Sequence, residues 1–127
     1  MLAKEIMSKK VITISKDKTV HDAARLMKRH DIGALPVVED EKLIGIITES
    51  DIFKKIVAKN LLPSKITVKS FMTKKVVTAP PDIKVHEIDG LLFTNNIRRI
   101  LIVDDKRKVI GIVSASDLIR QAYHWKK

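Results

Sequence analysis

Two short motifs in the chain combine a hydroxyl side chain with an aspartate three residues later. Thr48 precedes Asp51, and Ser114 precedes Asp117, each at the end of a β-branched run that contains one glycine. Such a run predicts a buried strand, and a hydroxyl at its end is typical of a helix N-cap, with the aspartate in the first turn, where the helix dipole favours a carboxylate. The motif alone favours a simple cap. The alternative is a cap whose hydroxyl and carboxylate also hold a sugar diol.

Both motifs belong to an internal repeat that covers most of the chain. When Met7 is set against Met72, the two copies stay in line at a separation of about 65 residues, with one inserted residue near Arg107. The repeat places one copy in residues 1–62 and the other in residues 63–127. A half of roughly 60 residues buries less of its surface than the whole chain does, so we expect the two halves to share a core.

The hydrophobic pattern predicts a short strand, a helix, two strands and a second helix in each copy. In the first copy the strands are expected at 11–14, 35–38 and 43–47. The first helix is expected to begin after Asp17 or Thr19 and to stop at a left-handed Gly33. The second is expected to run to about Asn60, and its predicted packing residues are Ile52, Ile56 and Val57.

The second copy departs from the first at three places, where Arg98 and Arg99 replace Gly33 and Ala34, Leu101 replaces Pro36, and Gly90 lies inside the expected helix. An interior glycine costs about 1 kcal/mol relative to alanine. Gly90 therefore predicts a close helix contact or the close approach of a ligand. The arginine pair belongs to one copy only, and its simplest interpretations are a surface pair or ion pairs with Asp104 and Asp105.

The chain of 127 residues carries a formal net charge of +10. This charge favours a polyanionic partner, either nucleic acid or a phosphorylated ligand. Between Ile52 and Pro81 every charged side chain is a lysine, at positions 54, 55, 59, 65, 69, 74 and 75. Such a run is typical of a solvated face, with an anion-binding surface as the alternative.

Several function classes are disfavoured. The chain has no cysteine, which excludes disulfides and thiolate chemistry. Neither a signal peptide nor an apolar run long enough for a membrane helix is visible, so we expect a cytoplasmic protein that binds no membrane. His21 and His86 recur at equivalent positions, but each lies beside an acid and neither has metal-ligand spacing. We therefore expect no catalytic residue, no metal site and no enzymatic activity.

The repeated residues together resemble a tandem CBS-domain pair, the Bateman module, of the free-standing prokaryotic type. The resemblance rests on Met-Ser-Lys-Lys-Val-Ile-Thr at 7–13, Leu-Pro-Val-Val at 35–38 and Gly-Ile-Val-Ser-Ala-Ser-Asp at 111–117. It implies an α/β (α+β) fold of two β-α-β-β-α repeats packed through their sheets with pseudo-twofold symmetry. It further implies a non-catalytic regulatory or energy-sensing module that needs no cofactor. Its clefts would bind AMP, ADP, ATP or S-adenosylmethionine.

The resemblance also implies roles for individual residues. Ribose would be held by Asp51, Asp117, Thr48 and Ser114, and phosphate by Arg98 and Arg99. In one cleft adenine would lie among Ser8, Val11, Ile12 and Ile112, and in the other among Thr73, Val76, Val77 and Ile46. Because only one copy has the arginines, we expect asymmetric clefts, of which one binds phosphate better.

Such modules commonly pair as homodimers, and the output would pass to an unidentified effector protein. Tyr123 and Trp125 near the end of the chain fit packing against a partner subunit, or a cap on the core. The competing interpretation is a basic surface that binds nucleic acid or another polyanion, for which no helix-turn-helix or zinc motif is present.

Overall fold

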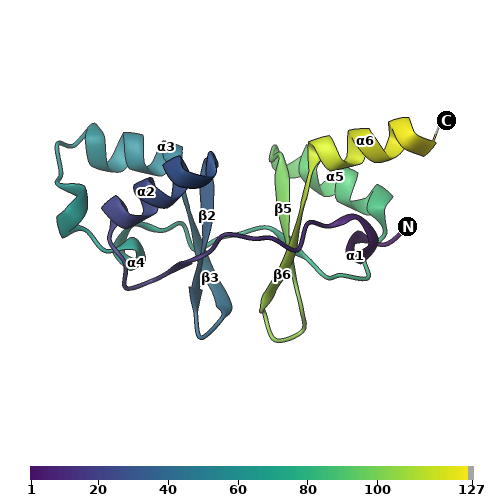
Figure 1. Cartoon of the computed structure of the whole chain (residues 1–127), viewed down its shortest axis with the longest axis horizontal. Coiled ribbons are helices and arrows are strands. Elements are labelled where there is room, and N and C mark those ends of the chain that lie inside the picture. Colours follow the sequence, from purple (N-terminus) through teal and green to yellow (C-terminus); the bar gives the residue numbers. More distant parts are fainter. Residues whose placement is uncertain (126–127) are drawn as a thin grey trace. The chain divides into compact units, whose positions relative to one another are not determined.

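The chain divides into two compact units in the computed structural model, which describes residues 1–125 (Figure 1). The central unit is Ile12–Val76. The terminal unit combines Met1–Val11 with the chain from Val77 onward. Each unit contains one three-stranded sheet and its helices. The fold is thus a mixture of helix and sheet, as the repeat predicts, whereas the predicted packing of one sheet on the other stays a prediction.

The central unit is built on a sheet of order β1-β2-β3. Its strands are β1 (Ile14–Ser15), β2 (Ala34–Glu39) and β3 (Lys42–Thr48), with β1 parallel to β2 and β2 antiparallel to β3. Asp40 and Glu41 both have positive φ, as a tight two-residue hairpin requires. The helical segments are α2 (Val20–His30), α3 (Glu49–Asp51), the π-helix η1 (Ile52–Val57), the 3-10 helix η2 (Pro63–Lys65) and α4 (Val68–Phe71).

The terminal unit repeats this arrangement with the sheet order β4-β5-β6. Its strands are β4 (Thr78–Ala79), β5 (Arg99–Val103) and β6 (Val109–Ser114), and its helices are α1 (Ala3–Ile6), α5 (Val85–Asn95) and α6 (Ala115–Trp125). Figure 1 shows α1 beside β6, so the beginning of the chain completes the unit that its end forms. The predicted role of Trp125 lies outside the residues whose side chains are described.

The start of each repeat lies in the unit that contains the end of the other repeat. Ser8 forms an antiparallel bridge with Ile112 in the terminal unit, and Thr73 forms the equivalent bridge with Ile46 in the central unit. The compact units therefore differ from the sequence repeats at 1–62 and 63–127, whose limits stay a prediction. Exchanged starting segments tie the two halves of the sequence together.

Most buried residues of the described chain belong to two clusters, one in each unit, and Leu43, Leu101 and Val103 are buried outside both. In the central unit the cluster includes Val20, Leu35 and Ile47, and in the terminal unit it includes Ile88 and Val113. The halves share these clusters through the exchanged segments. Ala3 from the first repeat is fully buried in the terminal cluster, and Val68 from the second repeat is fully buried in the central one.

Helix α2 begins as predicted and ends differently. Thr19 is the N-cap, and the Oγ1 of Thr19 accepts a hydrogen bond of 3.1 Å from the backbone N–H of Asp22. The C-cap is Asp31, with φ of 52°, whereas Gly33 has no positive φ. The prediction of Gly33 as the left-handed stop was wrong because aspartate also tolerates this conformation, and it occurs two residues earlier.

Two other elements of the central unit, the first strand and the second helix, differ from their predictions. The first strand is confined to Ile14–Ser15, and is shorter than the predicted 11–14. Val57 was predicted to pack with Ile52 and Ile56 but is 59% exposed, whereas Ile56 is fully buried. The segment Ile52–Val57 is a π-helix, whose wider turns do not follow the α-helical spacing on which that prediction depended.

Gly90 has surroundings that differ from the prediction, and the repeated glycines Gly45 and Gly111 have a packing role. No described heavy atom lies within 4 Å of the position that a Cβ would take on Gly90, so no close helix contact in this chain requires this glycine. A Cβ on Gly111 would overlap the side chain of Met7, and one on Gly45 would overlap Met72. The repeated glycines thus make room for a methionine from the exchanged segment.

None of the helices within residues 1–125 combines the length and the apolar character needed to cross a bilayer.

Replacing these glycines should have opposite effects on stability. We expect Gly90→Ala to raise the free energy of unfolding by about 1 kcal/mol, because α5 gains helix propensity without a clash. We expect Gly111→Ala to lower it by about 1–3 kcal/mol, because the buried site has no space for a methyl group. Urea unfolding followed by circular dichroism at one protein concentration measures both. Equal stability of Gly111→Ala and the unmodified chain would contradict the close contact with Met7.

The cap of α2 should make stability depend on pH in the acid range. Hydrogen bonds from the backbone N–H and the hydroxyl of Thr19 lower the pKa of Asp22 below its usual value. A lowered pKa in the folded state adds stability that is complete above the unfolded-state pKa of about 3.9 and is lost as the pH falls through the folded-state pKa. Asp22→Asn should therefore be less stable than the unmodified chain at neutral pH, and the difference should shrink on acidification.

The measurement is urea unfolding from pH 7 to pH 2. Asp82→Asn is the control, because the exposed Asp82 side chain has no hydrogen bond or ion pair within the described chain. A stability difference for Asp22→Asn that stays constant across this range would contradict the assignment.

Candidate functional site

The hydroxyl-aspartate motif of the terminal unit forms a reciprocal cap at the junction of β6 and α6. The backbone N–H of Asp117 donates a 3.2 Å hydrogen bond to the Oγ of Ser114. The backbone N–H of Ser114 donates a 2.8 Å hydrogen bond to the Oδ2 of Asp117. The Oδ1 of Asp117 accepts a hydrogen bond of 2.9 Å from the guanidinium of Arg120. The residues around this cap are here called the Asp117 site.

The central unit has the same cap between β3 and α3, here called the Asp51 site. Thr48 and Asp51 exchange two hydrogen bonds of 3.1 Å, again through the Oδ2 of the aspartate. Its Oδ1 lies 3.2 Å from the Nζ of Lys55. The capping interpretation is thus confirmed at both motifs. In both, one carboxylate oxygen is committed to the backbone and the other to a side-chain cation.

The second carboxylate oxygen is the chemically available one. The side chain of Asp51 is 14% exposed and that of Asp117 is 23% exposed, so both retain access to solvent. Their cationic partners are more exposed, at 44% for Lys55 and 75% for Arg120. Exposed ion pairs of this kind contribute little free energy and exchange readily. A fixed carboxylate that accepts hydrogen bonds is suited to a neutral ligand with vicinal hydroxyls.

The exchanged segments lie on the strands that lead to these caps. Ser8 and Ile112 exchange two backbone hydrogen bonds of 2.9 and 3.0 Å, two residues before Ser114. Ile46 and Thr73 exchange two of 2.9 and 2.8 Å, two residues before Thr48. The structure therefore brings Ser8 and Thr73 to the predicted motifs, each from the start of the other repeat.

For four of the predicted pocket residues, the structure gives the burial and the unit but no hydrogen bond to the motif within the described residues. Val11 and Val76 are half-buried, and each lies in the same unit as the motif with which it was grouped. Ile12 packs against the buried cluster of the central unit, and Val77 packs against that of the terminal unit. Each of these two belongs to the unit opposite to its predicted motif, so their part in a pocket stays a prediction.

The two arginines flank the cap of the Asp117 site. The carbonyl of Arg98 accepts a 2.8 Å hydrogen bond from the backbone N–H of Ala115, and Arg99 lies opposite Ser114 in the β5–β6 ladder. Both residues are exposed, and neither forms an ion pair within the described chain. Of the two simple interpretations, ion pairs with Asp104 and Asp105 are therefore wrong, and an exposed surface pair fits the structure.

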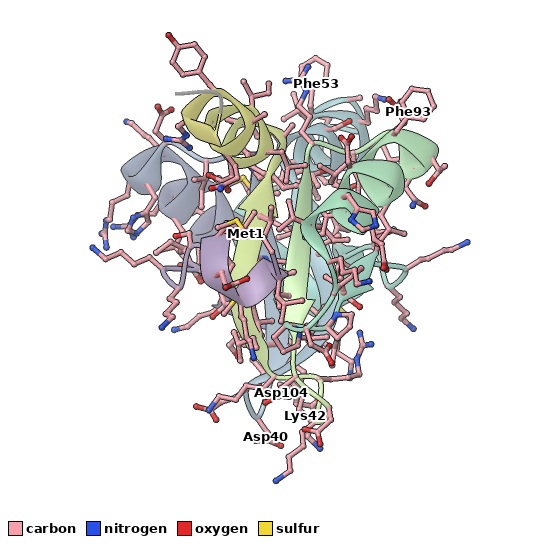
Figure 2. All side chains as sticks on the ribbon, turned by 90° about the vertical axis from the view of Figure 1, so that its right-hand side faces the viewer. Met1, Asp40, Lys42, Phe53, Phe93 and Asp104 are labelled. Atoms are coloured by element: carbon pink, nitrogen blue, oxygen red, sulfur yellow. The ribbon has the colours of Figure 1, made fainter. Side chains whose placement is uncertain are left out.

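The backbone of the β5–β6 loop instead engages Asp104. Its Oδ1 accepts hydrogen bonds of 2.9 Å from the N–H groups of Lys106 and Lys108, and these bonds hold the pKa of the Asp104 carboxyl below its usual value. Figure 2 shows Asp104 at the tip of this loop. The guanidinium groups of Arg98 and Arg99 are thus free to contact a ligand.

The Asp51 site has an acidic side chain in the corresponding place. The carbonyl of Gly33 accepts a 2.9 Å hydrogen bond from the N–H of Glu49, and Ala34 lies opposite Thr48. The carboxylate of Glu49 lies against Gly33, where any Cβ would overlap it. Glu49 was not among the predicted site residues, although the alignment of Glu49 with Ala115 and of Gly33 with Arg98 shows this difference in charge. The two sites therefore differ by a reversal of local charge.

A hollow of about 410 Å³ borders the Asp117 site. Its lining includes Glu5, Ile6, Asp117, Arg120 and Tyr123. The first helix of the chain thus forms one wall of the space beside the aspartate.

His21 and His86 are both exposed, and no group of three or more histidine or acidic side chains within the described residues is placed to hold a metal ion.

Two segments of the chain, residues 3–58 and residues 68–124, match the CBS domain family. The uncharacterized protein MJ1426 of Methanocaldococcus jannaschii is 37% identical, over 94% of this chain and 89% of that protein. The inosine-5'-monophosphate dehydrogenase of the same organism is 39% identical over 94% of this chain, but the match spans only 23% of the enzyme. The chain thus corresponds to a minor part of that relative's length.

The comparison with solved structures also identifies a CBS domain pair. The CBS domain pair of protein MJ0100, in complex with 5'-methylthioadenosine and S-adenosylmethionine, matches with a TM-score of 0.82 and 38% sequence identity. The match covers 100% of this chain and 98% of that chain. The repeated caps, the exchanged segments and these matches lead to one conclusion: the chain belongs to the CBS domain family and carries two CBS domains.

Proposed function

We propose that the chain is a regulatory module that binds adenosine-containing ligands at the Asp117 and Asp51 sites and performs no catalysis. The observation that carries this proposal is the reciprocal cap, which fixes one carboxylate oxygen of each aspartate and leaves the other on an exchangeable cation. Ribose hydroxyls would replace Arg120 or Lys55 as partners of that oxygen. Ser114 and Thr48 would lie beside the sugar. The likeness to a CBS domain pair in complex with two adenosine compounds supports this assignment.

Adenine would bind against the strands and the exchanged segments. At the Asp117 site the proposed wall is Ser8, Val11, Ile12 and Ile112. At the Asp51 site it is Thr73, Val76, Val77 and Ile46. The backbone bridges at Ser8 and Thr73 support the placement of one wall residue in each set. Apolar walls and backbone groups suit a flat, neutral base.

The reversal of charge leads to different ligands at the two sites. Arg98 and Arg99 would bind the phosphates of AMP, ADP or ATP at the Asp117 site, because charge-assisted bonds to phosphate need cations. At the Asp51 site, Glu49 would repel phosphate and favour a ligand with a neutral or positive tail, such as S-adenosylmethionine. This difference refines the expectation that one site binds phosphate better.

The exposed apolar side chains support a homodimer formed through the helices. Phe53, Phe93, Ile119 and Tyr123 are between 67% and 86% exposed. Figure 2 shows Phe93 pointing away from α5. Contiguous exposed apolar patches mark protein contacts, and we infer that these four side chains contribute to such a contact. We further propose that the dimer passes its signal to an effector protein. We also propose that it is located in the cytoplasm.

The proposal predicts the outcome of isothermal titration with AMP, ATP and S-adenosylmethionine at low and high salt. We expect saturable binding, and Asp117→Asn should weaken AMP binding by about tenfold or more, because a hydrogen bond to a charged group is worth about 1.5–3 kcal/mol. Asp51→Asn should weaken S-adenosylmethionine binding in the same way. Asp105→Asn is the matched control, since it removes one exposed charge from the same unit.

Thermal unfolding of each variant separates loss of the ligand contact from loss of the cap. Absence of binding by all three ligands would contradict the proposal. Binding that depends steeply on salt but ignores both aspartates would favour a polyanion bound by the exposed lysines between Ile52 and Pro81 instead.

A further inference from the structure

We propose a second kind of ligand site in the central unit: a groove between β1 and α2 that binds the phosphate groups of a small phosphorylated molecule. The groove has a volume of about 290 Å³, and its polar lining is Thr13, Ser15, Lys18, Asp22, Arg25 and Arg29. None of these residues belongs to the Asp51 or Asp117 site. The site is therefore independent of the function proposed above.

The groove presents groups that recognise phosphate. Arg25 and Arg29 lie one turn apart on α2, so both guanidinium groups reach the same side of the helix. Lys18 adds an ammonium from the turn after β1, where its N–H donates to the carbonyl of Ser15. Thr13 and Ser15 contribute hydroxyls. Paired guanidinium groups bind phosphate oxygens through several fixed N–H donors.

The cations of the groove, Lys18, Arg25 and Arg29, form no close ion pairs within the described chain. The pKa of Asp22 is nevertheless lowered by the hydrogen bonds from Thr19 and, to a smaller extent, by the charge of Lys18. The nearby acids Asp17 and Glu39 are both engaged by Lys16, at 3.7 and 3.8 Å.

Asp22 is the acid within the groove, and its Oδ2 is committed to the N–H and hydroxyl of Thr19. Three cations therefore face one carboxylate, which leaves an excess of positive charge for an anion to satisfy.

The second repeat shows that this charge is not a requirement of the fold. In the alignment of Met7 with Met72, the positions of Lys18, Arg25 and Arg29 are occupied by Ile83, Gly90 and Thr94. Helix α5 forms over the same 11-residue length as α2 without these cations. The charges thus add a property to one unit that its counterpart lacks.

The size of the groove favours a compact ligand. Pockets for small molecules range from about 300 to 1,000 Å³, and this groove lies at the lower limit of that range. A diphosphate group fits such a volume. A nucleic acid strand would instead need a basic stripe extending well beyond one groove.

Isothermal titration with pyrophosphate tests the site. The titration uses the Arg98→Gln/Arg99→Gln chain, so that phosphate contacts of the Asp117 site do not contribute. We expect saturable binding with one pyrophosphate per chain, weakened at least tenfold by Arg25→Gln/Arg29→Gln. Lys28→Gln/Lys59→Gln removes two exposed charges outside the groove and should change the affinity less than twofold. Arg29→Thr, which installs the residue of the second repeat, should give an intermediate loss.

Three results would overturn the proposal. One is the absence of saturable pyrophosphate binding. Another is equal weakening by the groove variant and the lysine control, which would indicate a general charge effect. A third is preferential binding of a single-stranded oligonucleotide that also depends on Arg25 and Arg29, which would identify a nucleic acid surface. Binding of AMP through Asp117 is measured separately, so failure of either proposal is distinguishable from failure of the other.

Discussion

The structure depends on the exchange of two short starting segments between the repeats. Ser8 pairs with Ile112, and Thr73 pairs with Ile46, each through two backbone hydrogen bonds. Each pairing is possible because the preceding residue of the strand is a glycine that accommodates a methionine side chain. A single repeat would lack its edge segment and part of its buried cluster. The exchange therefore makes the tandem pair, and not one repeat, the unit that folds.

The repeated motif caps a helix, and we propose that it also binds a ligand. The hydroxyl and one carboxylate oxygen start a helix, and this cap holds the aspartate in a fixed position. The other oxygen keeps only an exposed cationic partner. Under the proposed function, a side chain that is positioned for folding would also be preorganised for binding, without further ordering cost. The difference in charge next to the two caps, Arg98 against Glu49, is the feature by which we propose that one scaffold distinguishes ligands.

The sequence alone predicted the repeat and the caps at Thr48 and Ser114, because these features depend on local pattern and on the two-fold repetition of the chain. The approach of Ser8 to Ile112 was implied only by the resemblance to CBS-domain pairs. The sequence did not predict the contact of Glu49 with Gly33, the π-helix at Ile52–Val57 or the basic groove on α2. The charge of Glu49 was visible in the alignment of the repeats, but its contact with Gly33 and the basic groove depend on which face an element presents, and the π-helix depends on local winding; a one-dimensional pattern specifies neither.

Amide NMR spectra of the 15N-labelled protein during titration with AMP would test most directly whether the caps hold the ligand. We expect the largest chemical shift changes at Ser8, Ser114 and Asp117, where the strand, the cap and the exchanged segment meet. Asp82, which lies in a turn outside the Asp117 site, should change little. Saturable shifts that avoid Ser114 and Asp117 would show that the caps serve folding alone, and would contradict the central claim.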